Sequence, residues 1–157
     1  MPLYDLDTAF KWKWLLAVRI CAFTNQRTTR IRFQLWAAVN TAALAEAKKH
    51  LGQPYVWGAE GPKSFDCSGL VMYSYSKFHV STPRVSSDQF KAALKIPASR
   101  AVPGDLVFYH DKFGDVYHVG IYLAPGQTVA AIDPAEGVDY QTIWDPHTAT
   151  YGSFTHN

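Results

Sequence analysis

One cysteine in the chain stands where a thiol could act as a nucleophile. Cys67 follows a loop over 53–66 that is rich in glycine and proline, and it begins the stretch Cys67–Phe78, whose apolar spacing predicts a helix. The free N–H groups and the dipole at a helix N-terminus favour the thiolate, the reactive form of cysteine. A buried structural cysteine is the alternative, because cysteine is often buried. The other cysteine, Cys21, lies in an apolar stretch and fits that structural role better.

A nucleophilic thiol needs a base, and His118 is the histidine best placed to provide one. It opens the apolar run His118–Leu123, which predicts a strand, and a strand holds a side chain more firmly than a loop does. Gly120 would let another part of the chain approach closely. Cysteine and histidine that are distant in sequence and meet in the fold are the expected arrangement for a thiol nucleophile. A structural histidine is the alternative, so these residues alone indicate only a candidate Cys/His hydrolase.

The elements that must position these two residues change from helices to strands along the chain. Apolar residues at every fourth position predict a helix over Arg30–Leu51, and a shorter helix is expected over Ser86–Leu94. The stretch Phe10–Phe23 fits both periodicities, and a helix is favoured there. Turn residues then separate four predicted strands: Asp105–Tyr109, His118–Leu123, Gln127–Ile132 and Val138–Ile143. Helices followed by closely spaced strands predict an α+β fold, with helices packed on an antiparallel sheet of about five to six strands.

Composition and missing motifs exclude several classes of protein. The chain has 157 residues, of which 48% are apolar and 18% charged, which excludes intrinsic disorder and fits one domain. Two cysteines cannot build a disulfide framework or a four-thiolate zinc site. The sequence contains no glycine-rich phosphate loop and no zinc-protease motif, so we expect neither a cofactor nor a metal. No apolar run approaches the ~20 residues of a membrane span, and we recognise no signal peptide.

The charge of +2 is unevenly distributed. Residues 1–50 carry eight Lys and Arg against three acids, a net +5, whereas residues 51–157 carry seven against ten, a net −3. Contact between residues 1–40 and an anionic surface is one interpretation, and a solvated basic face is the alternative. We expect no nucleic-acid partner, and we expect a monomer.

Five motifs, which occur in order, resemble the NlpC-type cell-wall cysteine peptidases. The resemblance covers about residues 43–138, and it implies a papain-like fold. It divides the chain into a basic segment, 1–40, outside the resemblance, and a catalytic domain, 41–157. The motifs are Leu51–Gly58 (LGQPYVWG), Phe65–Val71 (FDCSGLV), Pro83–Ser86 (PRVS), Pro103–Phe108 (PGDLVF) and His118–Leu123 (HVGIYL).

The resemblance also implies an activity and assigns residues to it. Members of the family hydrolyse peptidoglycan stem peptides, commonly between D-glutamate and the diamino acid that follows, so the protein is expected to be secreted or associated with the cell wall. Cys67 matches the family nucleophile and His118 matches its base. Tyr55, Asp66 and Ser68 match residues beside the substrate groove, with the aspartate facing a substrate amine through a charge-assisted bond.

Three residues in these motifs have a structural alternative. Asp66 directly precedes a predicted helix and could serve as its N-cap, a role that does not exclude substrate binding. Arg84 could meet a substrate carboxylate, but we favour an interaction that anchors its loop. Trp57 is expected to be a core aromatic under the loop that contains it.

The sequence departs from the family at the residue that orients the catalytic histidine. Family members usually carry a polar residue, often histidine, at the position of Ala130, and alanine supplies no side-chain acceptor. Asp133 is the nearest acidic residue downstream, but strand alternation turns it to the opposite face. We therefore expect a backbone carbonyl, a water or a distant side chain to orient His118. The departure favours a rival interpretation, a non-catalytic cell-wall binding module, and a thiol amidase or acyltransferase acting on another amide is a third.

Overall fold

The structure is a computed structural model that describes residues 36–145 and 148–155. The predicted helix over Phe10–Phe23, and all but the last residues of the basic segment 1–40, lie outside these ranges. The first described element is helical over 36–48, within the helix expected over Arg30–Leu51. The expected boundary after residue 40 falls inside this helix.

Helices and strands follow in the order that the sequence predicts, which confirms the α+β fold. Every pairing in the sheet is antiparallel, and the strand order is β1-β6-β2-β3-β4-β5. The elements are α2 (Cys67–Ser76), α3 (Ser86–Ala92), β1 (Leu94–Ile96), the 3-10 helix η1 (Ala98–Arg100), β2 (Leu106–His110), β3 (Val116–Ala124), β4 (Gln127–Ala131), β5 (Val138–Thr142) and β6 (Thr150–Ser153).

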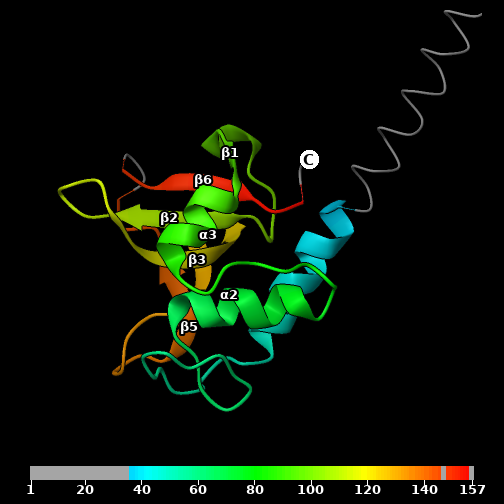
Figure 1. The fold of residues 1–157 in the computed structure, drawn as a ribbon, viewed down its shortest axis with the longest axis vertical. Coiled ribbons are helices and arrows are strands. Elements are labelled where there is room, and N and C mark those ends of the chain that lie inside the picture. The colour runs from blue at the N-terminus through cyan, green and yellow to red at the C-terminus, as the bar shows by residue number, and fades with distance from the viewer. Residues whose placement is uncertain (1–35, 146–147, 156–157) are drawn as a thin grey trace, which may run out of the picture. The chain divides into compact units, whose positions relative to one another are not determined.

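The helices cover one face of the sheet, where the main core lies (Figure 1). Successive strand residues point to opposite faces, so Val119 and Ile121 of β3 face the helices while His118 faces the other way. Leu70 and Tyr75 of α2 are fully buried against this face. A smaller apolar cluster occupies the opposite face; its buried members are Val107, Tyr109, Tyr122, Ile143 and Tyr151.

A buried asparagine links the helix over 36–48 to the sheet. The Asn40 amide donates a 2.7 Å hydrogen bond to Asp105, which directly precedes β2. The hydroxyl of Thr155, beyond β6, donates to the side-chain amide oxygen of Asn40 at 2.8 Å. Buried polar groups must be paired, so these bonds fix the position of this helix on the sheet.

Strands β1 and β6 were not predicted, and the third helix ends earlier than expected, at Ala92. Strand β1 has three residues, and its Leu94 and Lys95 are exposed, so no alternation is visible. Strand β6 contains Gly152 and has four residues. Strands this short depend on their neighbours in the sheet, because three or four residues are too few to show a strand pattern.

Candidate active site

Asp66 and a close backbone contact set the start of α2, which carries Cys67. Asp66 is the N-cap of α2, and its carboxylate accepts a 2.7 Å hydrogen bond from the backbone N–H of Gly69. A Cβ at residue 69 would lie 2.2 Å from the carbonyl oxygen of Ala59. Glycine therefore lets the preceding loop pack directly on the first turn of the helix. This contact fixes the position of Cys67, the first residue of α2.

Four of the predicted site residues line one cavity of about 310 Å³. Cys67 and Ser68 enter it from the start of α2, and Tyr55 and Asp66 enter it from the loop before. Trp57 also lines the cavity, and its expected core position is wrong, because its side chain is 85% exposed. The remaining lining residues are Gly58, Arg84, Val85, Ser86 and Tyr117.

Arg84 binds two carboxylates at the edge of this cavity. Its guanidinium donates to both oxygens of Asp66, at 3.0 and 2.6 Å, and through Nε to Glu60 at 2.7 Å. It also donates to the hydroxyl of Ser68 at 3.0 Å. The arginine thus anchors its own loop to the N-terminus of α2, the role favoured by the sequence.

The carboxylate of Asp66 is charged at neutral pH. Burial raises its pKa, but hydrogen bonds from Arg84 and from the backbone N–H groups of Gly69 and Gly58 outweigh that effect and hold the pKa below its ordinary value. Asp66 and Glu60 carry two negative charges against the one positive charge of Arg84. The cluster of the three residues at the edge of the cavity is therefore net anionic and suits a cationic ligand group, although Glu60 itself does not line the cavity.

The thiol of Cys67 is neutral at rest. Burial raises its pKa above the ordinary value, and backbone hydrogen bonds from Val119 and Ser68 lower it by less. The dipole expected at a helix start is therefore not sufficient to stabilise a thiolate, because only 8% of the residue is exposed. The bond from Val119 places the thiol beside the backbone of β3, one residue beyond His118.

His118 is buried in a mainly aromatic environment. The residue is 6% exposed, and the rings of Tyr109, Tyr117 and Trp144 lie with centroids 5.3, 6.4 and 5.8 Å from the imidazole. Burial lowers its pKa to about 4, although a hydrogen bond with Gln141 raises it. The imidazole is therefore neutral over the physiological range, which is the form that accepts a proton.

The side chain that lies within hydrogen-bond distance of the imidazole is Gln141, and not Ala130 or Asp133. The distance between Gln141 Oε1 and His118 Nε2 is 3.2 Å. Ala130 lies opposite Asp139 in the pairing of β4 with β5. The carboxylate of Asp133 is occupied in the turn between these strands, where it accepts from the backbone N–H groups of the second and third residues after it, at 2.8 and 2.9 Å.

A hydrogen-bonded chain behind Gln141 holds its carbonyl oxygen in place. Thr128 lies opposite Gln141 in the β4–β5 register, and its hydroxyl donates to Gln141 Oε1 at 3.3 Å. The hydroxyl of Tyr109 is 3.5 Å from the same threonine oxygen. A Cβ at Gly120 would lie 2.8 Å from that oxygen, so glycine provides the close approach that the sequence indicated. The only local signal for Gln141 is a polar residue within a predicted strand.

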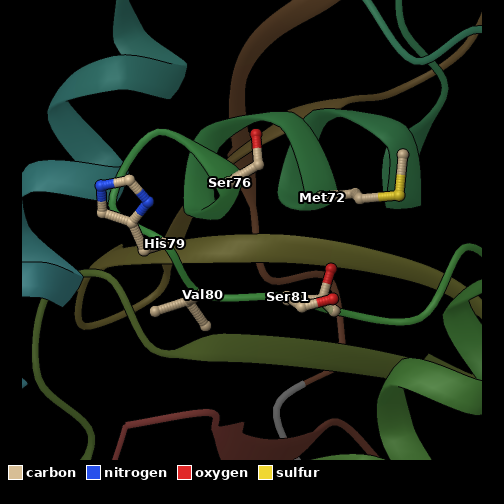
Figure 2. A pocket seen from close by; sticks show the side chains of 6 residues that line it. Met72, Ser76, His79, Val80 and Ser81 are labelled. Carbon is tan, nitrogen blue, oxygen red and sulfur yellow. The ribbon is translucent and has the colours of Figure 1, made fainter.

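A second cavity, of about 330 Å³, lies between α2 and the extended segment that follows it (Figure 2). Met72 and Ser76 reach it from the helix, and Val80 and Ser81 line it from the extended segment that follows. None of the predicted site residues lines it. Within residues 36–145 and 148–155, no helix is long and apolar enough to cross a membrane, and no cluster of His, Cys, Asp and Glu could hold a metal.

The low pKa of His118 predicts that acid destabilises the fold between pH 6.5 and about 4. In this window the unfolded chain binds a proton on His118 that the folded protein excludes, so the free energy of unfolding falls as the pH falls. The pKa difference corresponds to about 3 kcal/mol at most. Denaturant unfolding at several pH values measures how the free energy of unfolding depends on pH. In His118→Gln this dependence should be weaker between pH 6.5 and about 4.

His79→Asn is the matched control, because His79 is exposed and its φ of 60° suits asparagine. This variant should keep the wild-type dependence of the free energy of unfolding on pH. An equal dependence for the wild type and His118→Gln would show that His118 is not buried as a neutral group.

The α+β fold carries a cysteine at a helix start and a histidine on the adjoining sheet. This is the arrangement expected of the papain-like class of cysteine peptidase folds. The model of the NlpC/P60 family matches residues 52–152, so the chain belongs to this family and the resemblance is confirmed. The chain is 46% identical over 113 residues to "Probable endopeptidase p60" of Listeria innocua, covering 72% of this chain and 23% of that protein.

Two further comparisons come from a curated relative and a solved structure. The chain is 37% identical over 116 residues to "Bifunctional muramidase/DL-endopeptidase CwlT" of Bacillus subtilis, covering 69% of this chain and 35% of that protein. The crystal structure of the NlpC/p60 domain of peptidoglycan hydrolase SagA matches with a TM-score of 0.64 and 36% identity, covering 73% of this chain and 97% of that one. The chain thus spans only a quarter to a third of the length of these curated relatives.

Proposed function

We propose that this domain is a cysteine endopeptidase that cleaves peptidoglycan stem peptides between D-glutamate and the diamino acid that follows. One observation carries the proposal. The Cys67 thiol lies in a cavity beside Val119 of β3, and the residue before Val119 is His118, whose imidazole is hydrogen-bonded to Gln141. The names of the p60, CwlT and SagA relatives support peptidoglycan as the substrate. The protein would then act outside the cell or at the cell wall.

With its side-chain oxygen facing Nε2, Gln141 favours the tautomer that this reaction needs. A carbonyl oxygen at Nε2 requires a proton on Nε2, which leaves the lone pair of His118 on Nδ1. The reversed amide would donate to Nε2 and would require the proton on Nδ1, so that no base would be available. Gln141 therefore takes the orienting role that Ala130 does not fill, which favours catalysis over the non-catalytic binding module.

The reaction then starts from a neutral thiol and a neutral imidazole. As Sγ of Cys67 attacks the scissile carbonyl carbon, its proton passes to Nδ1 of His118. The tetrahedral intermediate collapses as the imidazolium gives that proton to the departing amine, which leaves a thioester on Cys67. Water attacks the thioester with His118 again as base, and the second tetrahedral intermediate releases the carboxylate and the thiol.

The net anionic cluster at the edge of the cavity fits one end of a stem peptide. The cluster of Asp66, Glu60 and Arg84 carries a net charge of −1, and the free amine of a stem peptide is an ammonium. We assign recognition of this group to Asp66, with Tyr55 and Ser68 beside it in the same cavity. Arg84 would hold the carboxylate in position for that contact.

Digestion of purified peptidoglycan fragments tests the function. Mass spectrometry should show a product with a new free amine on the diamino acid and a partner ending in D-glutamate. Fragments with an acetylated stem-peptide amine should be cleaved more slowly, because the ammonium is lost. Cleavage of a different amide bond would support the third interpretation, and binding without cleavage would support the non-catalytic module.

A further inference from the structure

A tryptophan from the segment after β5 packs against the histidine proposed as the base. The rings of Trp144 and Tyr109 stack, with centroids 4.2 Å apart and an interplanar angle of 21°. The Trp144 and His118 rings are 5.8 Å apart and inclined by 27°. With the Tyr109–His118 distance of 5.3 Å, the three rings form a closed group in which each contacts the other two.

Exposure differs sharply within this group. Trp144 is 51% exposed, whereas Tyr109 and His118 are 2% and 6% exposed. The indole therefore forms the outer layer of the group and separates the imidazole from solvent. Trp144 lies outside the five sequence motifs, and it does not line the cavity that contains Cys67.

We propose that Trp144 is a positioning residue, which covers the imidazole of His118 and keeps water from its hydrogen bond with Gln141. A hydrogen bond in a dry, low-dielectric environment is stronger than one that competes with water. Removing the indole would admit water to Nε2, let the ring rotate and weaken the selection of its tautomer. The inference depends on the proposed function for its effect on rate, but not for its effect on the histidine.

The groups that face the imidazole of His118 are uncharged, so burial is the main influence on its pKa. From β2 it meets Tyr109, whose pKa burial raises to about 12, and from β3 it meets Tyr117. From β5 it meets the neutral amide of Gln141. The neutral thiol of Cys67 lies beside the backbone of Val119, the next residue of β3. The carboxylate on the same face of β5, Asp139, is exposed. Opening the aromatic cover is thus expected to raise the low pKa of His118.

Histidine titration by NMR tests the proposal in the full chain, using Cys67→Ala as the background so that the readout does not require activity. Trp144→Ala should raise the pKa of His118 by at least one unit, and Trp144→Phe should restore most of the shift. In the protein with Cys67 intact, Trp144→Ala should lower kcat by roughly 10-fold or more with KM changed less than threefold. Tyr140→Ala is the matched control, because Tyr140 is 50% exposed and lies on the other face of β5.

An unchanged His118 pKa in Trp144→Ala would overturn the proposal, whatever happened to the rate. So would a shift of the same size in Tyr140→Ala, since general loosening of the sheet would then explain it. If Trp144→Ala raised the pKa of His118, but the wild-type protein with Cys67 intact showed no peptidase activity, the packing role would be supported and the proposed function rejected.

Discussion

Alanine in place of Cys67 is expected to lower kcat/KM on stem peptides by roughly 10⁴-fold or more, because the attacking atom is removed. Cys67→Ser should be nearly as inactive, since a hydroxyl in the same buried position gives up its proton less readily than a thiol. Both variants should keep the circular dichroism spectrum of the wild type. Release of the cleaved peptide, followed by mass spectrometry, measures the loss.

Ser74→Ala is the matched control on the same helix. Ser74 is fully buried in α2, and its hydroxyl has no hydrogen-bond partner within the described residues, so its removal should leave activity within threefold of wild type. Activity that survives Cys67→Ala within tenfold would eliminate Cys67 as the nucleophile and the proposed mechanism with it.

The second large effect is expected at Gln141. Gln141→Leu removes the acceptor at Nε2 of His118 while filling the same space, so kcat should fall by roughly 10²- to 10³-fold with little change in KM. Gln141→Glu keeps an acceptor and should retain more activity than the leucine variant. Nitrogen chemical shifts of His118 should show the proton on Nε2 in the wild type and a mixture of tautomers in Gln141→Leu.

Asp133→Ala is the control for this pair of variants. Its carboxylate serves the turn between β4 and β5, so the substitution should lower kcat/KM by less than ~10-fold. If Asp133→Ala lost several hundredfold with its fold preserved, while Gln141→Leu stayed active, the orienting role would belong to Asp133.

Local sequence was sufficient for the helix that carries Cys67 and for most of the sheet. Asp66 precedes α2 and caps it, and a cap is a contact between residues three apart. Strands β2 to β5 were predicted because short runs of β-branched and aromatic residues, bounded by turn residues, mark strands. The family motifs added the cavity residues Tyr55 and Ser68, which the structure places together with Cys67.

The tertiary structure alone decided which side chain meets His118. Gln141 reaches the imidazole because the register of β5 on β4 sets it opposite Thr128, and a register is a relation between strands that neither strand encodes by itself. The neutral state of Cys67 likewise follows from burial by distant residues, which outweighs the local effect of the helix start. A helix cap or a strand bounded by turn residues is determined by neighbours in the chain, whereas burial and cross-strand contacts exist only once the chain has folded.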